Sequence, residues 1–184
     1  VELLSSQEVQ NRSNAVRPDG LRGGIWSASE ACVDPRQAIA ELPNFLAREY
    51  GVELCFSTPV QALDLPNIYT PSTTWRAERA IVCSGVDFES LYPSIYQSSG
   101  LTRCKLQMMR TAPQPDGWTM GPMLAGGLTL RHYPTFEHCE SVDALTQRVA
   151  TETPELDRWG IHVMANQNGM GEVVLGDSHE YGMD

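Results

Sequence analysis

The side chains best suited to chemistry in this sequence are histidines in its second half. His132, His162 and His179 are widely spaced, whereas His138 and Cys139 are adjacent. All are of types that bind zinc, but zinc sites in proteins usually take two ligands from a pair only a few residues apart. The spacing therefore predicts no metal site, and we interpret the adjacent pair as accidental.

A polar run near the end of the chain, Asp177-Ser178-His179-Glu180, contains the residue types of a hydrolytic triad. Triad residues converge from separate elements, so their adjacency in sequence argues against a hydrolase. His162 lies in the apolar segment 161–165, where two interpretations stay open. It either packs as a structural side chain in a sheet or faces a ligand. In the second case its imidazole can donate to an anionic group and gain a proton near neutral pH.

The clearest positional signal for a ligand is the stretch Ala80–Gly85. Four residues that favour a buried strand run directly into Ser84 and Gly85. A short apolar run of this kind is typical of a parallel strand covered on both faces. In open α/β sheets, ligands bind at the carboxyl ends of strands, and a glycine there lets another group approach the backbone. The alternative is a buried strand that simply ends in Ser-Gly.

The elements before this stretch favour a Rossmann-like arrangement. Asp34 as N-cap and Pro35 at the first helical position predict a helix over 35–50. A strand over 52–56 follows it, after a glycine suited to ending the helix. An antiparallel excursion over 59–78 then leads to the parallel strand described above.

The rest of the chain predicts a largely antiparallel sheet with helices. The expected elements are helices over 88–97 and 142–152, strands over 101–109 and 129–132, and a hairpin of strands over 161–165 and 172–176. The predicted fold class is therefore a mixture of α/β and α+β, in which a partial Rossmann-like layer accompanies an antiparallel sheet.

Composition narrows the class of protein. With 184 residues, 41% of them hydrophobic, the chain can form one good core or two small ones. A net charge of −10 without a Lys/Arg cluster argues against a nucleic-acid partner. No apolar run is long enough to span a membrane. Five cysteines, an odd number without a CxxC pair, predict buried free thiols in a reducing cytoplasm.

Together these motifs resemble the middle of flavoprotein oxidoreductases of the D-amino-acid oxidase superfamily, near glycine oxidase and sarcosine oxidase. The resemblance covers roughly residues 20–181. It rests on Val33–Pro35 with the helix after it, Gly51–Glu53, Thr58–Val60, Ala80–Gly85 and Gly169–Tyr181. It implies FAD as the cofactor. It also implies that the backbone of Val60 meets the adenine end of FAD and that Cys83, Ser84 and Gly85 border the nucleotide.

The sequence departs from this family in two respects. It contains no strand–GxGxxG–helix unit for the FAD pyrophosphate, and the family's C-terminal segment over the flavin is missing. We therefore expect an internal portion of such an enzyme. Residues 1–30 would be the end of a substrate-domain segment and a linker, 31–87 part of the FAD-binding domain, and 88–184 the substrate-binding domain. This portion alone is expected to bind FAD poorly and to be inactive.

The resemblance implies a cytoplasmic enzyme that oxidises a small amine or amino acid by hydride transfer to flavin N5. It places His162, Ser178 and His179 along the substrate cavity, assigns no catalytic residue, and puts Val174 where sarcosine oxidases carry a lysine. The ending Gly176–Tyr181 is similar to a branch associated with aminophosphonate metabolism. Expected partners are the substrate and the remaining segments of the same polypeptide. The alternative is a non-catalytic binding module, or a remnant of such an enzyme without cofactor.

Overall fold

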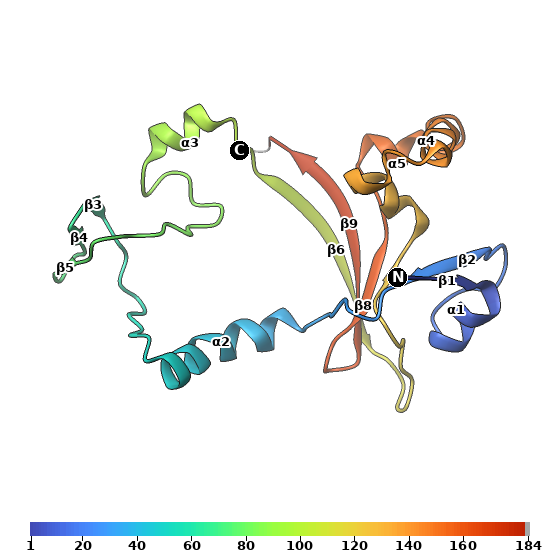
Figure 1. Ribbon diagram of the computed structural model, residues 1–184, viewed down its shortest axis with the longest axis horizontal. Coiled ribbons are helices and arrows are strands. Elements are labelled where there is room, and N and C mark those ends of the chain that lie inside the picture. Colours follow the sequence, from blue (N-terminus) through green and yellow to red (C-terminus); the bar gives the residue numbers. More distant parts are fainter. Residues whose placement is uncertain (183–184) are drawn as a thin grey trace. The chain divides into compact units, whose positions relative to one another are not determined.

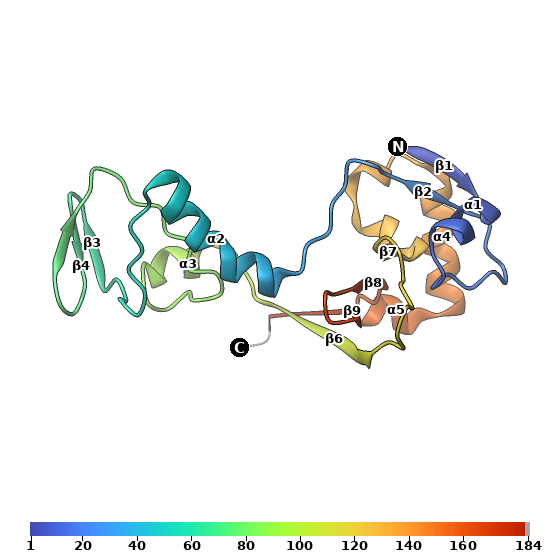
Figure 2. The ribbon, with the colours of Figure 1, turned by 90° about the horizontal axis from the view of Figure 1, so that it is seen from below.

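The computed structural model describes residues 1–182, which form two compact units. The first unit combines Val1–Ala38 with the chain from Cys104 onward, and the second is Ile39–Arg103. Figures 1 and 2 trace the chain from two directions. The domain boundaries expected after residues 30 and 87 stay predictions. None of the helices within the described residues is long and apolar enough to cross a membrane.

The first unit is built on a four-stranded antiparallel sheet. Its strands lie in the order β6 (Cys104–Pro113), β9 (Glu172–Tyr181), β8 (Met164–Gln167) and β7 (Leu124–Ala125). The two long strands, β6 and β9, run side by side in Figure 1, with Leu106 opposite His179 and Gln107 opposite Ser178. Because β9 also pairs with β8, it is an inner strand with a hydrogen-bonded neighbour on each side.

The remaining elements of this unit attach to the sheet through a few specific contacts. They are β1 (Glu2–Ser5), α1 (Ser6–Arg12), β2 (Gly23–Trp26), the 3₁₀ helices η1 (Gly127–His132) and η2 (Pro134–Phe136), α4 (Glu140–Glu152) and α5 (Pro154–Arg158). The Ser13 hydroxyl donates to the Met120 carbonyl at 2.6 Å, and the Met120 N–H donates to Gln167 Oε1 of β8 at 2.8 Å. Buried Met120 thus links Ser13, the residue after α1, to the sheet.

The second unit contains a small antiparallel meander between two helices. Its elements are the larger part of α2 (Pro35–Tyr50), then β3 (Ala62–Asp64), β4 (Asn67–Tyr69), β5 (Thr74–Arg76) and α3 (Pro93–Ser99). The strands pair in sequence order, with Leu63 opposite Ile68 and Ile68 opposite Trp75. This meander is the antiparallel excursion that the sequence predicts over 59–78.

The mixed α/β class with antiparallel sheets and helices is confirmed, but the predicted parallel strands are wrong. Residues 52–56 and 80–83 form no strand, and the Ile81 side chain is 89% exposed. An apolar run forms a strand only where a neighbouring strand satisfies its N–H and C=O groups. Within residues 1–182 no strand pairs with either segment, so both stay outside any sheet.

The strand predicted over 129–132 is also wrong, because the chain turns into η1 at that point. The Gly126 N–H still donates to the Val163 carbonyl at 2.7 Å, which prolongs the β7–β8 pairing by one residue. The carbonyl of Gly126 does not continue this pairing, because it accepts a hydrogen bond from the Thr129 N–H at 2.9 Å. The hairpin of β8 and β9 and the helix α4 agree with the predictions.

Two smaller expectations need correction. The helix expected over 88–97 begins only at Pro93, because Tyr92 has a left-handed backbone (φ 54°) that no helical residue adopts. All five cysteines are free but exposed, so the expected burial of the thiols is wrong. Cys83, for example, lies in a segment that forms no strand and therefore receives no covering layer.

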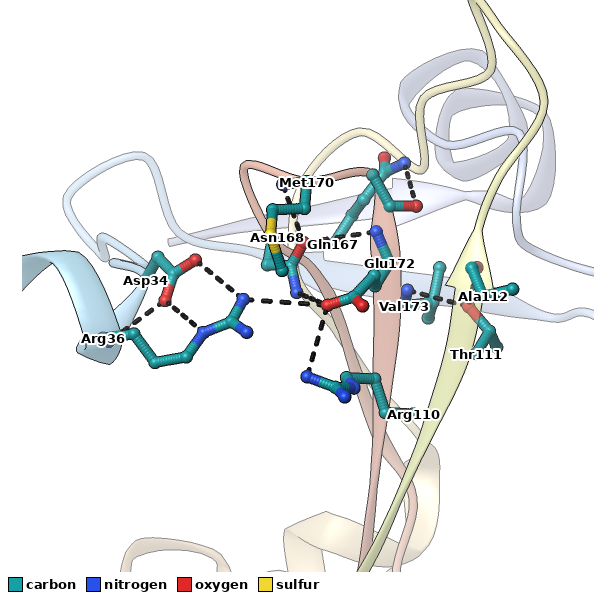
Figure 3. Close-up of polar contacts among 11 residues, drawn as sticks. Asp34, Arg36, Arg110, Thr111, Ala112, Gln167, Asn168, Met170, Glu172 and Val173 are labelled. Carbon is teal, nitrogen blue, oxygen red and sulfur yellow. Dashed lines mark hydrogen bonds and ion pairs between the residues drawn. The ribbon is translucent and has the colours of Figure 1, made fainter.

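A buried carboxylate, Glu172 at the start of β9, connects three parts of the first unit (Figure 3). Its Oε2 atom lies 3.7 Å from Arg36 Nη2 at the start of α2 and 3.5 Å from Arg110 Nη1 of β6. The same atom accepts a 2.8 Å hydrogen bond from Asn168 Nδ2 in the β8–β9 turn. Arg36 also binds Asp34, and these hydrogen bonds lower the pKa of the Asp34 carboxyl. The network fixes the turn and the first residues of α2 against the sheet.

We expect the Glu172→Gln substitution to lower the free energy of unfolding by about 1–2 kcal/mol. The amide keeps the shape of the side chain and can still accept from Asn168, but it removes the charge that faces Arg36 and Arg110. Urea unfolding of the purified protein measures the effect. Glu137→Gln, at an exposed carboxylate, is the control and should change stability by less than about 0.5 kcal/mol. Equal effects of the two substitutions would contradict the prediction.

Candidate functional site

A cavity of about 440 Å³ lies in the second unit. Three of the four residues predicted to contact the cofactor line it: Val60, Cys83 and Ser84. The other lining residues are Leu63, Ile68, Ala80, Ile81, Val82 and Leu91. Mostly apolar walls with a few polar groups are typical of pockets that hold an organic ring. The stretch before Gly85 thus lines a cavity, although it does not form the expected strand.

The fourth predicted residue, Gly85, adjoins this cavity in the chain and has an open surface beside it. Its φ angle is +61°, and a Cβ atom built there would meet nothing within 4 Å. The loop after it is held by its own hydrogen bonds. The Ser84 hydroxyl donates to the Asp87 carbonyl at 3.0 Å and lies 3.2 Å from the Tyr96 hydroxyl. Hydrogen bonds from Ser90 and from the Glu89 N–H lower the pKa of the Asp87 carboxyl.

A second candidate site, in the first unit, is a cluster of three imidazoles from His132, His162 and His179. The ring centroids of His132 and His162 are 4.1 Å apart, and those of His162 and His179 are 5.0 Å apart. One nitrogen from each ring lies within 4.8 Å of the others. Two of the three predicted substrate residues therefore come together, and His132 joins them.

Pairing between β9 and the residues just before β8 builds this cluster. The Asp177 N–H donates to the His162 carbonyl at 2.9 Å, and the His162 N–H donates back to the Asp177 carbonyl at 3.4 Å. Side chains alternate along a strand, so Asp177 and His179 share one face of β9 and Ser178 faces the other. The cluster therefore contains His162 and His179 but not the third predicted residue, Ser178.

The residues just after α5 pack closely against the same face of β9. The His179 N–H donates to the Trp159 carbonyl at 2.9 Å, and a Cβ atom at Gly160 would come within 3.0 Å of His179 Cβ. Gly160 also has a left-handed backbone (φ +56°), so glycine suits this position in both respects. This close approach helps to fix the His179 ring beside the other two imidazoles.

A buried carboxylate faces two of the imidazoles. Asp177 Oδ2 lies 3.4 Å from His179 Nε2, and Asp177 Oδ1 lies 3.7 Å from His162 Nε2. On the other side of the His162 ring, Nδ1 lies 3.3 Å from the hydroxyl of buried Thr129. Burial is the main cause that lowers the pKa of both His132 and His162, with the neighbouring imidazoles adding to it. Both rings therefore favour the neutral form at pH 7, even though Asp177 opposes the shift at His162.

Sequence reasoning misses His132 because nothing local links it to His162 or His179. It is the last residue of η1, a segment expected to be a strand, and only the tertiary fold brings it to the cluster. Asp177 belongs to the polar run after Gly176 in the sequence. Whether its side chain faces the imidazoles depends on the β8–β9 register, which the sequence does not reveal.

Comparison with known proteins gives one match. A family model described as FAD dependent oxidoreductase matches residues 1–182 of this chain. No curated protein and no solved structure matches it.

Proposed function

The chain belongs to this family of FAD-dependent oxidoreductases, and we propose that the protein oxidises a small amine or amino acid, with aminophosphonates among the candidate substrates. The family indicates FAD as the cofactor. When bound, the flavin accepts at N5 the hydride that leaves the carbon next to the substrate amine. The residues of this chain would hold the cofactor and orient the substrate.

The cavity of the second unit fits one ring of the cofactor. Seven of its nine lining residues are apolar, and Ser84 adds a hydroxyl group. We therefore assign the adenine end of FAD to Val60, Cys83, Ser84 and Gly85. None of the nine lining residues is charged, so the lining does not fit the pyrophosphate. No strand–GxGxxG–helix unit lies within the described residues to bind it either.

The observation that carries the substrate proposal is the buried carboxylate beside the imidazole cluster. The Asp177 side chain is 7% exposed, and its Oδ1 atom has no hydrogen-bond partner among the described residues. An ammonium group would satisfy that oxygen and neutralise its charge. His162 and His179 can donate to a carboxylate or phosphonate on the same molecule. Ser178, on the opposite face of β9, remains a proposed substrate residue outside this cluster.

The alternative is a binding module that has no cofactor. The uncharged lining of the cavity favours it, because a flavin nucleotide carries a pyrophosphate that needs donors or positive charge. The two proposals differ in whether the purified complete protein contains flavin at all.

We expect Gly85→Val, made in the complete protein, to lower the flavin content of the purified protein at least twofold. The valine side chain would fill the open space beside the cavity where the nucleotide is proposed to approach the backbone. The ratio of flavin absorbance to protein absorbance after gel filtration measures the effect. Gly51→Val is a matched control, because Gly51 also has a left-handed backbone (φ +66°) and open space around its Cβ position. Both glycines have a left-handed backbone, so equal flavin contents would remove Gly85 from the proposed site.

In the complete protein, we expect His162→Asn to lower kcat/KM at least tenfold on the best substrate among glycine, sarcosine and aminophosphonates, a loss of about 1.4 kcal/mol. The substitution removes the imidazole proposed to orient the substrate while keeping a polar side chain of smaller size. Steady-state kinetics, normalised to bound flavin, measure the loss. His138→Asn, at an exposed histidine outside the cluster, should leave kcat/KM unchanged. A fall of less than about threefold in the His162 variant would show that His162 contributes little to transition-state binding.

A further inference from the structure

The imidazole cluster of the first unit has the donor atoms of a metal site. Three nitrogens, one each from His132, His162 and His179, lie within 4.8 Å of one another, and the Asp177 carboxylate lies beside the Nε2 atoms of His162 and His179. We propose that these three imidazoles bind one divalent transition-metal ion of the zinc class, with Asp177 as a fourth ligand or as the carboxylate that orients the ring of His179.

Two buried atoms that lack partners point to a ligand at this place. His162 Nε2 and Asp177 Oδ1 are both inaccessible to solvent, and neither makes a hydrogen bond within the described residues. Their side chains are 6% and 7% exposed. A buried polar atom left unpaired costs about 1–3 kcal/mol, so native structures normally pair such atoms. The two atoms are 3.7 Å apart and face each other, and one cation between them would satisfy both.

The spacing of the donors suits a metal after a small adjustment. If the three nitrogens stood at the largest separation of 4.8 Å, a central ion would lie about 2.8 Å from each. Zinc–imidazole distances are about 2.0–2.1 Å, so each nitrogen would have to move inward by about 0.7 Å. Small rotations about the side-chain torsions achieve such a shift. His132 is exposed, so its ring has the most room for this rotation.

The surroundings of His162 prepare its Nε2 atom to act as a ligand. A metal-binding histidine normally donates its other ring N–H to a fixed acceptor, which sets the tautomer and the ring orientation. Here Nδ1 faces the hydroxyl of buried Thr129 at 3.3 Å, so an Nδ1–H can donate to Thr129 and leave the Nε2 lone pair for the metal.

The ligand chemistry favours zinc and its neighbours over magnesium or calcium. Imidazole nitrogen suits Zn²⁺, Co²⁺, Ni²⁺ and Cu²⁺, whereas magnesium and calcium take oxygen ligands. The nearest positive charge in sequence, Arg131, is paired with Asp157 at 2.8 Å, which offsets its repulsion of a cation. Three nitrogens and one carboxylate or water complete a tetrahedral site.

The proposed metal site uses residues of the proposed substrate site but does not depend on the proposed function. With an ion bound, the anionic group of the substrate would meet the ion instead of the imidazoles. Metal binding is therefore measured without substrate, and the kinetics of the unaltered protein are compared with and without chelator.

The test is calorimetric titration of chelator-treated protein with Zn²⁺, followed by the visible spectrum of the Co²⁺ form. We expect one ion per chain and the intense visible absorption of tetrahedral Co²⁺. His132→Asn, at an exposed position, should preserve the fold and weaken zinc binding at least tenfold. His162→Asn and Thr129→Val should also weaken it, by removing a ligand and the group that orients it. His138→Asn is the matched control and should bind zinc as the unaltered protein does.

Several outcomes would overturn the proposal. They are the absence of stoichiometric binding in the unaltered protein, an octahedral Co²⁺ spectrum, or full zinc affinity in a folded His132→Asn variant. Circular dichroism checks that each variant is folded. Stoichiometric zinc binding by a protein that oxidises none of the amines tested would support the metal site and contradict the proposed function. If the unaltered protein oxidises an amine but binds no zinc, and the His162→Asn variant loses this oxidation, the result would support the proposed function and contradict the metal site.

Discussion

The two-sided pairing of β9 is the constraint on which the first unit depends. β9 exchanges hydrogen bonds with β6 on one side and β8 on the other, so a shift of one residue would break both ladders. Glu172, Asp177 and His179 all lie on this strand, and its register fixes their distances to groups on other elements. The Glu172 network and the imidazole cluster thus share one support. A change that disturbs β9 would alter both places at once.

The two buried carboxylates of β9 differ in how their charges are balanced. Glu172 faces two guanidinium groups and an amide donor, so its charge is paired and its oxygen is hydrogen-bonded. Asp177 faces two imidazoles, and its Oδ1 atom has no hydrogen-bond partner within the described residues. Burying a charged carboxylate is unfavourable unless an opposite charge or good donors compensate for it. The structure therefore completes the environment of Glu172 and leaves that of Asp177 incomplete, which is the physical reason to assign an ammonium group or a metal ion to the second place.

Features with local causes are the ones that the sequence predicts well. The start of α2 follows from Asp34 and Pro35, and the β8–β9 hairpin follows from apolar runs around a glycine-rich turn. The parallel strands at 52–56 and 80–83 are wrong because strand formation depends on a neighbouring strand, which local sequence does not reveal. For the same reason, the sequence predicts His162 and His179 as site residues but not the third imidazole, His132. Its three rings come from η1, the segment before β8, and β9, and only the tertiary fold brings His132 to the other two.

Because residues 80–83 form no strand, they are available to line the cavity of the second unit. Residues that were expected to be buried in a sheet instead line a cavity, and Ile81 lines it while its side chain stays 89% exposed. When an organic ring covers an apolar wall of this kind, the free energy falls in proportion to the apolar area removed from water. The same wall gives no stabilisation to a pyrophosphate, because none of its residues carries a charge. The cavity therefore suits the ring end of a nucleotide, and the phosphates of a bound FAD must be held by groups other than the nine that line it.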